Sequence, residues 1–200
     1  MPRGRPPKFD ETHVLDTAAD LFKRHGYDAV SVAELCDATG LAMQSLYNRF
    51  GDKAGLYRKT LDHYGKTAND PQIAALHAAD DPLAALQRFI RGWRHHAGAG
   101  PDGGCLFAQA LARGDRLNPD APDATARAYT ARLRKALAAT LRRAADHGQL
   151  TLDTDAPRLA DTLLTLTLGV AVAGRGGMPA PLIDHAITTA LGLLDDHAAA

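Results

Sequence analysis

Cysteine is scarce in this sequence, and neither sign of charge is in excess. The two cysteines, Cys36 and Cys105, lie far apart in the chain. This spacing argues against a disulfide framework and against a zinc site made of four thiolates. Lys plus Arg equals Asp plus Glu at 23 each, so the net charge alone points neither to a nucleic-acid partner nor to a membrane partner.

Long apolar runs and the common catalytic motifs are also missing. No stretch of about 18 consecutive apolar residues occurs, and residues 1–9 are rich in Pro and Arg instead of apolar residues. We therefore expect neither a membrane span nor a signal peptide, and we expect a soluble protein of the reducing cytoplasm. A Gly-rich phosphate loop, a nucleophile elbow and a His-Glu-x-x-His motif are missing too, so the sequence predicts no enzyme and no cofactor.

Helical periodicity covers most of the chain. Apolar residues recur at steps of three and four, and the alternation that is typical of strands does not occur. The sequence therefore predicts an all-α fold with about nine helices. The expected helices cover residues 11–25, 32–40, 43–50, 53–64, 82–97, 105–113, 124–147, 155–173 and 181–197.

Composition divides the chain into three parts. Residues 1–8 combine Pro and Gly with three cations, which is typical of a flexible basic arm that either solubilises the protein or enters a minor groove. Residues 9–66 hold the short helices of a first domain. Residues 67–200 form a second helical domain, and residues 69–81 at its start are predicted to be a loop with at most a short helix.

The segment 32–50 has the pattern of a helix-turn-helix, in which one helix braces against DNA and the next lies in the major groove. Gly40 tolerates the positive φ of the tight turn, while Leu46 and Phe50 face the core. Four hydrogen-bonding side chains then face outward: Gln44, Ser45, Asn48 and Arg49. Gln and Asn pair with adenine edges and Arg with guanine, each pair discriminating by about 1–3 kcal/mol. Taken alone, such a face is more often simply solvated.

A wider set of residues shares one register with this helix-turn-helix. The set comprises Gly26-Tyr27, Ser31 to Leu35, Ala38-Thr39-Gly40-Leu41, Ser45-Leu46-Tyr47, Phe50-Gly51-Asp52-Lys53 and Leu56. In this arrangement residues 9–64 closely resemble the DNA-binding domain of the TetR/AcrR regulators. The resemblance implies an N-terminal three-helix DNA-binding domain, followed by a helical bundle for ligand binding and dimerisation.

The resemblance also assigns roles to side chains of the first domain. It implies that Tyr47 and Lys53 hold phosphates and that Ser31 lies near the DNA backbone. It places Met43 in the groove with the four outward side chains, whereas the helical wheel puts Met43 beside the core residues, and both positions stay open. Phosphate contacts would fix the register, and base contacts would give the sequence preference.

The last two expected helices carry the predicted dimer contact. The first of them is apolar over too wide an arc for a single neighbour, which favours a four-helix interface around a twofold axis. The predicted interface residues are Leu159, Leu163, Leu166, Val170, Ile183, Ile187, Leu191 and Leu194. An edge of the protomer's own core is the alternative. A homodimer would reach two half-sites of a palindromic operator about 34–36 Å apart.

The middle of the second domain supplies candidates for a small-molecule pocket. Aromatic and a few polar side chains make up such pockets in helical bundles. The candidates are Trp93, His96, Cys105, Phe107, Gln109 and Tyr129, and each of them alone is more often a core residue. His95, His96 and Cys105 could bind a metal, but adjacent histidines on a helix diverge by about 100°, so no metal site is predicted.

Together these patterns predict a ligand-responsive, sequence-specific DNA-binding regulator. We expect a repressor that a small molecule releases from its operator, because the ligand binds two shapes of the dimer unequally. The alternative from another class is a helical protein-interaction module without DNA binding, which the balanced charge also permits.

Overall fold

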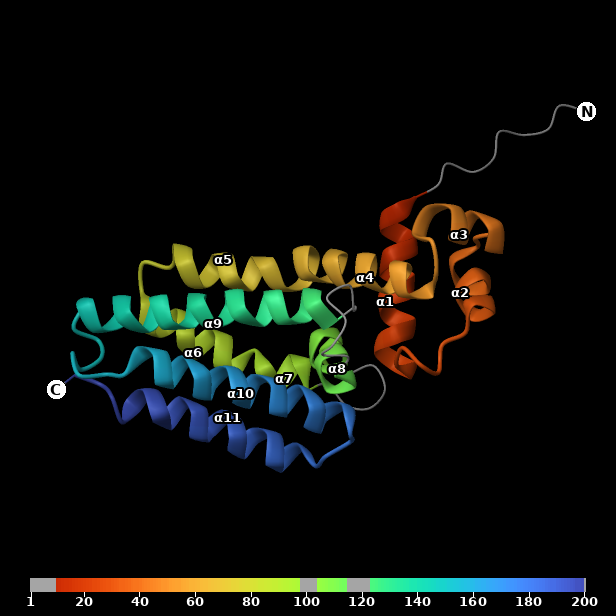
Figure 1. The fold of residues 1–200 in the computed structure, drawn as a ribbon. Helices are drawn as coiled ribbons and strands as arrows, with labels where there is room; N and C mark the ends of the chain where they lie inside the picture. The colour runs from red at the N-terminus through yellow and green to blue at the C-terminus, as the bar shows by residue number, and fades with distance from the viewer. Residues whose placement is uncertain (1–9, 98–103, 115–122, 200) are drawn as a thin grey trace, which may run out of the picture.

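The computed structural model describes residues 10–97, 104–114 and 123–199, and its regular elements there are helices. They are α1 (Glu11–His25), α2 (Val32–Thr39), α3 (Met43–Phe50), α4 (Lys53–Tyr64), the π-helical turn η1 (Gly65–Asn69), α5 (Asp70–Ala78), α6 (Pro82–Arg91), α7 (Trp93–His96), α8 (Leu106–Arg113), α9 (Asp123–Asp146), α10 (Ala156–Arg175) and α11 (Ala180–Asp195). Figure 1 shows α1 to α3 gathered at one end of a longer bundle. The predicted all-α fold is confirmed. The predicted basic arm, residues 1–8, lies outside the described residues.

The short helices of the first domain begin and end at residues suited to those positions. The hydroxyl of Ser31 accepts a hydrogen bond from the backbone N–H of Glu34, and the Glu34 carboxylate accepts one from the backbone N–H of Ser31. This capping box satisfies two free donors at the start of α2. Gly40 ends α2 with a φ of 70°, a left-handed conformation that glycine adopts without strain. Asp52 caps α4 in the same way as Ser31 caps α2, through the N–H of Gly55.

Helix α4 continues through η1 into α5, so the two domains share one long helix (Figure 1). The prediction for residues 69–81, a loop with at most a short helix, allowed for α5 but not for its continuity with α4. Pro71 occupies the first turn of α5, where its missing N–H breaks no helical bond. Ile73 and Leu76 are buried, and α5 packs against α9. Tertiary burial therefore outweighs a local composition that is typical of a loop. If α4, η1 and α5 are counted as one helix and α6 and α7 as another, the described residues contain nine helices, as predicted.

The second domain is built around α9. Leu133, Leu137 and Leu141 on α9 are buried, and this helix packs against α5, α6, α8 and α10. Among the described residues, one helix is long and apolar enough for a membrane span by length and composition alone, namely α10. One third of its most apolar window is buried in the bundle, where α10 packs between α9 and α11 (Figure 1).

The two domains meet where α1 ends. The side-chain amide of Gln109 on α8 donates a 3.1 Å hydrogen bond to the carbonyl oxygen of Lys23. Arg175 at the end of α10 donates to the same oxygen and, at 3.5 Å, to the carbonyl oxygen of Arg24. The last carbonyls of a helix lack partners within the helix. Donors from the second domain therefore complete the C-terminus of α1.

Candidate nucleic-acid interface

Two buried side chains hold α3 against the rest of the first domain. Leu46 is fully buried and Phe50 is 6% exposed. They are four residues apart and so lie on one face of the helix. Behind them an aromatic cluster of Phe22, Tyr27 and Tyr57 has ring centroids 4.8–5.8 Å apart. A helix of eight residues is marginal by itself, so this packing gives α3 its position.

The opposite face of α3 is exposed. Among the candidate DNA-binding residues on this helix, Met43 is 49% exposed and Tyr47 is 42% exposed. The others on this exposed face are Gln44, Ser45, Asn48 and Arg49. Of the two positions considered for Met43, packing in the core is wrong, because the α3 backbone turns this side chain to solvent. All six candidates on α3 thus lie on one accessible surface, which we call the α3 face.

Two of the base-reading candidates are already hydrogen-bonded to each other. The side-chain amide of Gln44 donates a 3.0 Å bond to Oδ1 of Asn48. Residues at i and i+4 are neighbours on a helix surface, and such a pair restricts both rotamers. The Asn48 amide therefore keeps its two N–H donors free of Gln44, since Gln44 occupies only its oxygen.

Lys53 differs from the exposed candidates because it is half-buried against Tyr27. Its Nζ lies 4.4 Å from the centre of the Tyr27 ring, within the range of a cation–π contact. Burial lowers the pKa of Lys53 from its ordinary value. Arg113 of α8 packs on the same ring, with its guanidinium carbon 3.9 Å from the centre, and forms an ion pair with Asp28 at 3.3 Å. Sequence reasoning missed Tyr27 and Arg113 as neighbours of Lys53, and only the Gly26-Tyr27 motif pointed to this region.

Ser31 lies exposed at the start of α2, as expected for a residue near a DNA backbone. Its hydroxyl donates a 2.7 Å bond to the Glu34 carboxylate. The hydrogen bonds from Ser31 lower the pKa of Glu34. Because the hydroxyl proton of Ser31 is already bonded to Glu34, it is not available to a phosphate. A phosphate at this position would instead accept hydrogen bonds from the free backbone N–H groups in the first turn of α2.

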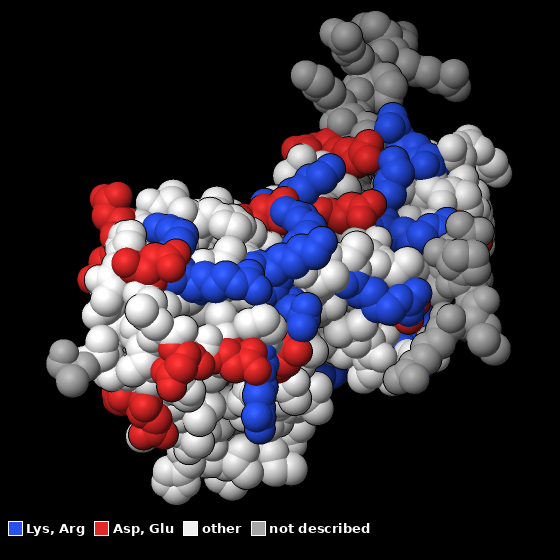
Figure 2. Space-filling view, turned by 60° about the vertical axis from the view of Figure 1, so that its left-hand side comes forward, with Lys and Arg blue, Asp and Glu red and all other residues white. Residues whose placement is uncertain are grey.

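Charges are unevenly distributed although the totals balance. On the face shown in Figure 2, Lys and Arg side chains form a band, and Asp and Glu side chains lie along its sides. Between α4 and α1, Lys59 forms an ion pair with Glu11 at 3.4 Å, and a ring nitrogen of His63 lies 2.6 Å from a carboxylate oxygen of Asp16. These two pairs join α4 to α1. They fix the long helix to the first domain and add little to a field outside it.

The candidates for a ligand site do not all come together. Phe107 stacks on Tyr129 with ring centroids 4.5 Å apart, and Cys105 lines the same small chamber. Burial raises the pKa values of Cys105 and Tyr129, so both stay neutral. Trp93 is 1% exposed and packs edge-on against Phe89. Gln109 does not line this chamber; it lies at the junction with α1, where it lines a second pocket together with Cys105. The His96 side chain lies outside the described residues.

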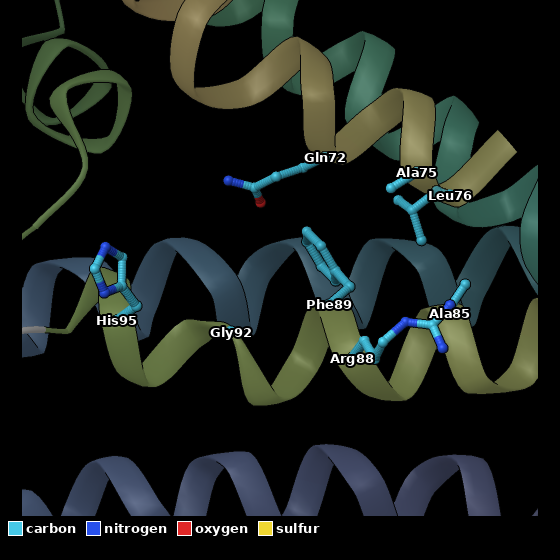
Figure 3. Close-up of a pocket in the computed structure, with 8 residues that line it drawn as sticks. All are labelled: Gln72, Ala75, Leu76, Ala85, Arg88, Phe89, Gly92 and His95. Carbon is cyan, nitrogen blue, oxygen red and sulfur yellow. The ribbon is translucent and has the colours of Figure 1, made fainter. Parts of the chain in front are cut away.

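A cleft of about 410 Å³ opens between α5 and the α6–α7 segment (Figure 3). Gln72 and Leu76 face it from α5, and Phe89 projects into it from α6. Arg88 and His95 also line it. Sequence reasoning missed this cleft because it predicted at most a short helix in the α5 segment and no packing partner for it. In the parts of the chain that the structure describes, no three His, Cys, Asp or Glu side chains group as metal ligands would.

The predicted dimer residues are mostly used within the protomer. Five of the eight are buried inside the protomer: Leu159, Leu163, Val170, Ile183 and Leu194. Leu166, Ile187 and Leu191 are half-buried. This is a correction to the predicted interface, because the most apolar arc of each helix faces its own core. The exposed side of α10 instead carries small residues at helical spacing, with Thr162, Thr165 and Gly169 among them.

Comparisons with known proteins match both domains. The family described as bacterial regulatory proteins, tetR family, matches residues 14–60. The family described as tetracyclin repressor-like, C-terminal domain, matches residues 82–189, more than half of the chain. The HTH-type transcriptional repressor ComR of Escherichia coli K12 is 50% identical over 62 residues, which are 31% of this chain and 30% of ComR. The repressor BdcR of the same organism is 33% identical over 130 residues, 64% of each chain. The matches thus span less than two thirds of these curated relatives.

Solved structures match over nearly the whole chain. A cysteine variant of the TetR family transcriptional regulator CifR, complexed with 26 bp double-strand operator DNA, has a TM-score of 0.80 and 27% identity. The match covers 94% of this chain and 98% of CifR. A transcriptional regulator from Cytophaga hutchinsonii has a TM-score of 0.81 at 18% identity, covering 96% and 98% of the two chains, and supports the fold.

Proposed function

The chain belongs to the TetR family of bacterial transcriptional regulators, and on this premise we propose that it is a homodimeric repressor that binds a palindromic operator through the α3 face. The single observation that carries the proposal is this exposed row of hydrogen-bonding side chains on a helix fixed by Leu46 and Phe50. The CifR structure, which contains operator DNA, supports the same partner.

The geometry divides the interface into positioning and reading residues. Tyr47 on the α3 face and Lys53 at the start of α4 would hold phosphates, whereas Gln44, Asn48 and Arg49 would contact base edges. Lys53 is suited to phosphate contact because its packing on Tyr27 fixes the direction of the ammonium group. Desolvation disfavours the charge of Lys53, and a nearby phosphate would favour it again.

A second protomer would pack on the exposed sides of α10 and α11. Thr165 and Gly169 on α10 and Leu182 on α11 are exposed there, and small residues allow two helices to approach closely. An interface of this kind relates two copies by a twofold axis and so matches two half-sites. The apolar composition of α10 is then explained by burial on both sides, against its own protomer and against the partner. Such a regulator would act in the cytoplasm, because that compartment gives it access to DNA.

Release by a small molecule completes the proposal. A ligand held in the second domain would favour one spacing of the two DNA-binding domains over another. The shared helix α4–η1–α5 and the contacts of Gln109 and Arg175 with α1 are the physical connections between the domains.

The proposal is tested by titrating the full-length protein with labelled duplexes from the DNA beside its own gene. We expect a specific duplex to bind at least a thousandfold more tightly than random DNA, with an affinity that falls steeply as salt rises because counterions are released. Binding that is absent at low salt would favour the alternative, a protein-interaction module. Specific binding that no effector weakens would leave a constitutive regulator.

A further inference from the structure

Two cavities of the second domain are separated by a pair of side chains. The open cleft of about 410 Å³ and a chamber of about 30 Å³ are both lined by Gln72 and Phe89. The cleft has the size of a small-molecule site, while the chamber has room for about one water. A rotation of the half-buried Phe89 would therefore join them into one continuous site.

The chamber contains a polar group that the protein leaves unused. Asn69, the last residue of η1, lines the chamber and is 3% exposed. Its side-chain Nδ2 has no hydrogen-bond partner among the described residues. A buried donor without a partner costs about 1–3 kcal/mol. Two threonines of the chamber differ in this respect, because Thr130 and Thr167 donate to backbone carbonyls at 3.0 Å and 2.7 Å.

From this arrangement we propose that the effector is an uncharged, flat apolar molecule with a carbonyl-type oxygen, and that Asn69 is the residue that recognises this oxygen. The inference rests on the proposed function and names the ligand class for it. The stacked rings of Phe107 and Tyr129 supply the apolar wall. The lining of the chamber, within the described residues, includes no Lys, Arg, Asp or Glu. A carboxylate would lose its hydration there without gaining a cation, which disfavours anionic ligands.

The same contacts connect the chamber to the shared helix. Gly65, the first residue of η1, lies so close to Phe107 that a Cβ there would be 3.3 Å from the ring. Asn69 closes the same turn at its other end. A ligand that pushes Phe107 and binds Asn69 would therefore act on both ends of the π-helical turn. Since α4 packs along α1, a change in this turn would move the DNA-binding domain.

Three probes with the same heavy-atom skeleton test the ligand class: acetophenone, cumene and benzoate. They carry a ketone, an isopropyl group and a carboxylate on the same ring. Calorimetric titration of the full-length protein should give an affinity for acetophenone on the order of tenfold above that for cumene, with benzoate weakest. Tightest binding by benzoate would overturn the proposal and assign recognition to Arg88 in the lining of the cleft. Equal binding of ketone and hydrocarbon, or no binding of either, would also overturn it.

Two variants test the residue. Asn69→Leu keeps the branching and the number of heavy atoms of the side chain and removes the donor, so it should abolish the preference for acetophenone over cumene. Thr167→Val is the matched control, because its hydroxyl already donates to Leu163, and it should keep the preference. Retained preference in Asn69→Leu would refute the assignment. If that variant unfolds, Asn69→Asp, which places an acceptor opposite the ketone, must lose the preference instead.

Operator binding is measured separately, without ketone and then with it. Acetophenone should weaken operator binding by the wild-type protein. It should leave operator binding by the Asn69→Leu variant unchanged. Failure of operator binding in the absence of ketone contradicts the proposed function. If the protein binds its operator normally but acetophenone neither binds preferentially nor weakens operator binding, only the present inference about the ligand is contradicted.

Discussion

The side chain of Gln109 is hydrogen-bonded at 3.1 Å to the carbonyl oxygen of Lys23 and thereby joins α8 to the last turn of α1. Gln109→Met keeps the length of the side chain and removes this bond. We expect the free energy of unfolding to fall by about 1 kcal/mol, because Arg175 still donates to the same oxygen. Urea unfolding measures the change. Gln87→Met on α6 is the control, and an equal loss in both variants would mean that the junction bond contributes nothing specific.

Replacement of Lys53 should weaken binding to every duplex. In Lys53→Met the stem remains on Tyr27 while the charge is lost, so specific and random DNA should lose affinity together and the salt slope should fall by about one. Anisotropy titrations at several salt concentrations measure both quantities. Lys135→Met is the control, since Lys135 is an exposed residue of α9 in the second domain. A loss confined to the specific duplex would move Lys53 from positioning to reading.

Replacement of Asn48 should reduce the preference of the protein for its operator over random DNA. Asn48→Ala is expected to cost about 1–3 kcal/mol on the operator and little on random DNA. Because Gln44 donates to Asn48 at 3.0 Å, Gln44→Ala should also affect the contact made by Asn48. A double-mutant cycle on operator affinity should give a coupling of about 0.5 kcal/mol or more. Strictly additive losses would show that the two side chains separate when DNA is bound.

A cation on the exposed side of α10 should dissociate the dimer. Thr165→Arg places a charge where the second protomer is proposed to pack, and the exposed position tolerates the longer side chain within the protomer. Sedimentation should show a folded monomer with operator affinity lowered by at least a hundredfold, because one half-site alone is bound. Leu152→Arg is the control at a residue 85% exposed in the turn after α9. A Thr165→Arg dimer would place the interface elsewhere.

The N-cap of α6 should contribute stability only above acidic pH. Asp81 accepts hydrogen bonds from the backbone N–H of Ala84 and from Gln149, at 2.9 Å and 2.8 Å, and these bonds lower the pKa of Asp81. The pKa is lower in the folded than in the unfolded state, so the contribution is present above the unfolded pKa and is lost as pH falls through the folded one. Asp81→Ala should lower Tm by about 2–4 °C at pH 7.

The pH dependence gives this prediction its control. The difference in Tm between Asp81→Ala and the unvaried protein should shrink as the pH falls from about 4 towards 2.5. Asp80→Ala, one residue earlier, should show no such trend. A difference in Tm that stays constant over this pH range would mean that Asp81 caps α6 without the negative charge of its carboxylate.

The sequence alone predicted the local structure well, because helix boundaries depend on nearby residues. The Ser31–Glu34 capping box and Gly40 bound α2 as expected, and α1 and α3 have the expected bounds. The outward direction of Gln44, Ser45, Asn48 and Arg49 follows in the same way from helical periodicity. The same periodicity placed Met43 beside the core, whereas its side chain is 49% exposed. For residues 69–81 the sequence predicted at most a short helix and missed its continuity with α4, because the burial of Ile73 and Leu76 depends on α9, some sixty residues away in the chain.

Features that depend on distant residues escaped the sequence patterns. The periodicity of α10 and α11 reveals an apolar face but not which neighbour covers it, and Leu163 and Leu194 turned out to face the protomer's own core. Likewise, the pairing of Gln109 with Lys23 and of Lys53 with Tyr27 joins separate elements. Side-chain type indicated a functional role for Gln109 but not its position at the junction.

The π-helical turn at 65–69 makes the length of this segment as important as its chemistry. Such a turn holds one residue more than the α-helical turn it replaces, and each residue of an α-helix corresponds to about 100° of rotation. Loss of one residue here would leave the packing inside each domain intact while rotating one domain against the other. A lineage could therefore change the operator spacing it recognises through a single deletion, without altering any residue that contacts DNA.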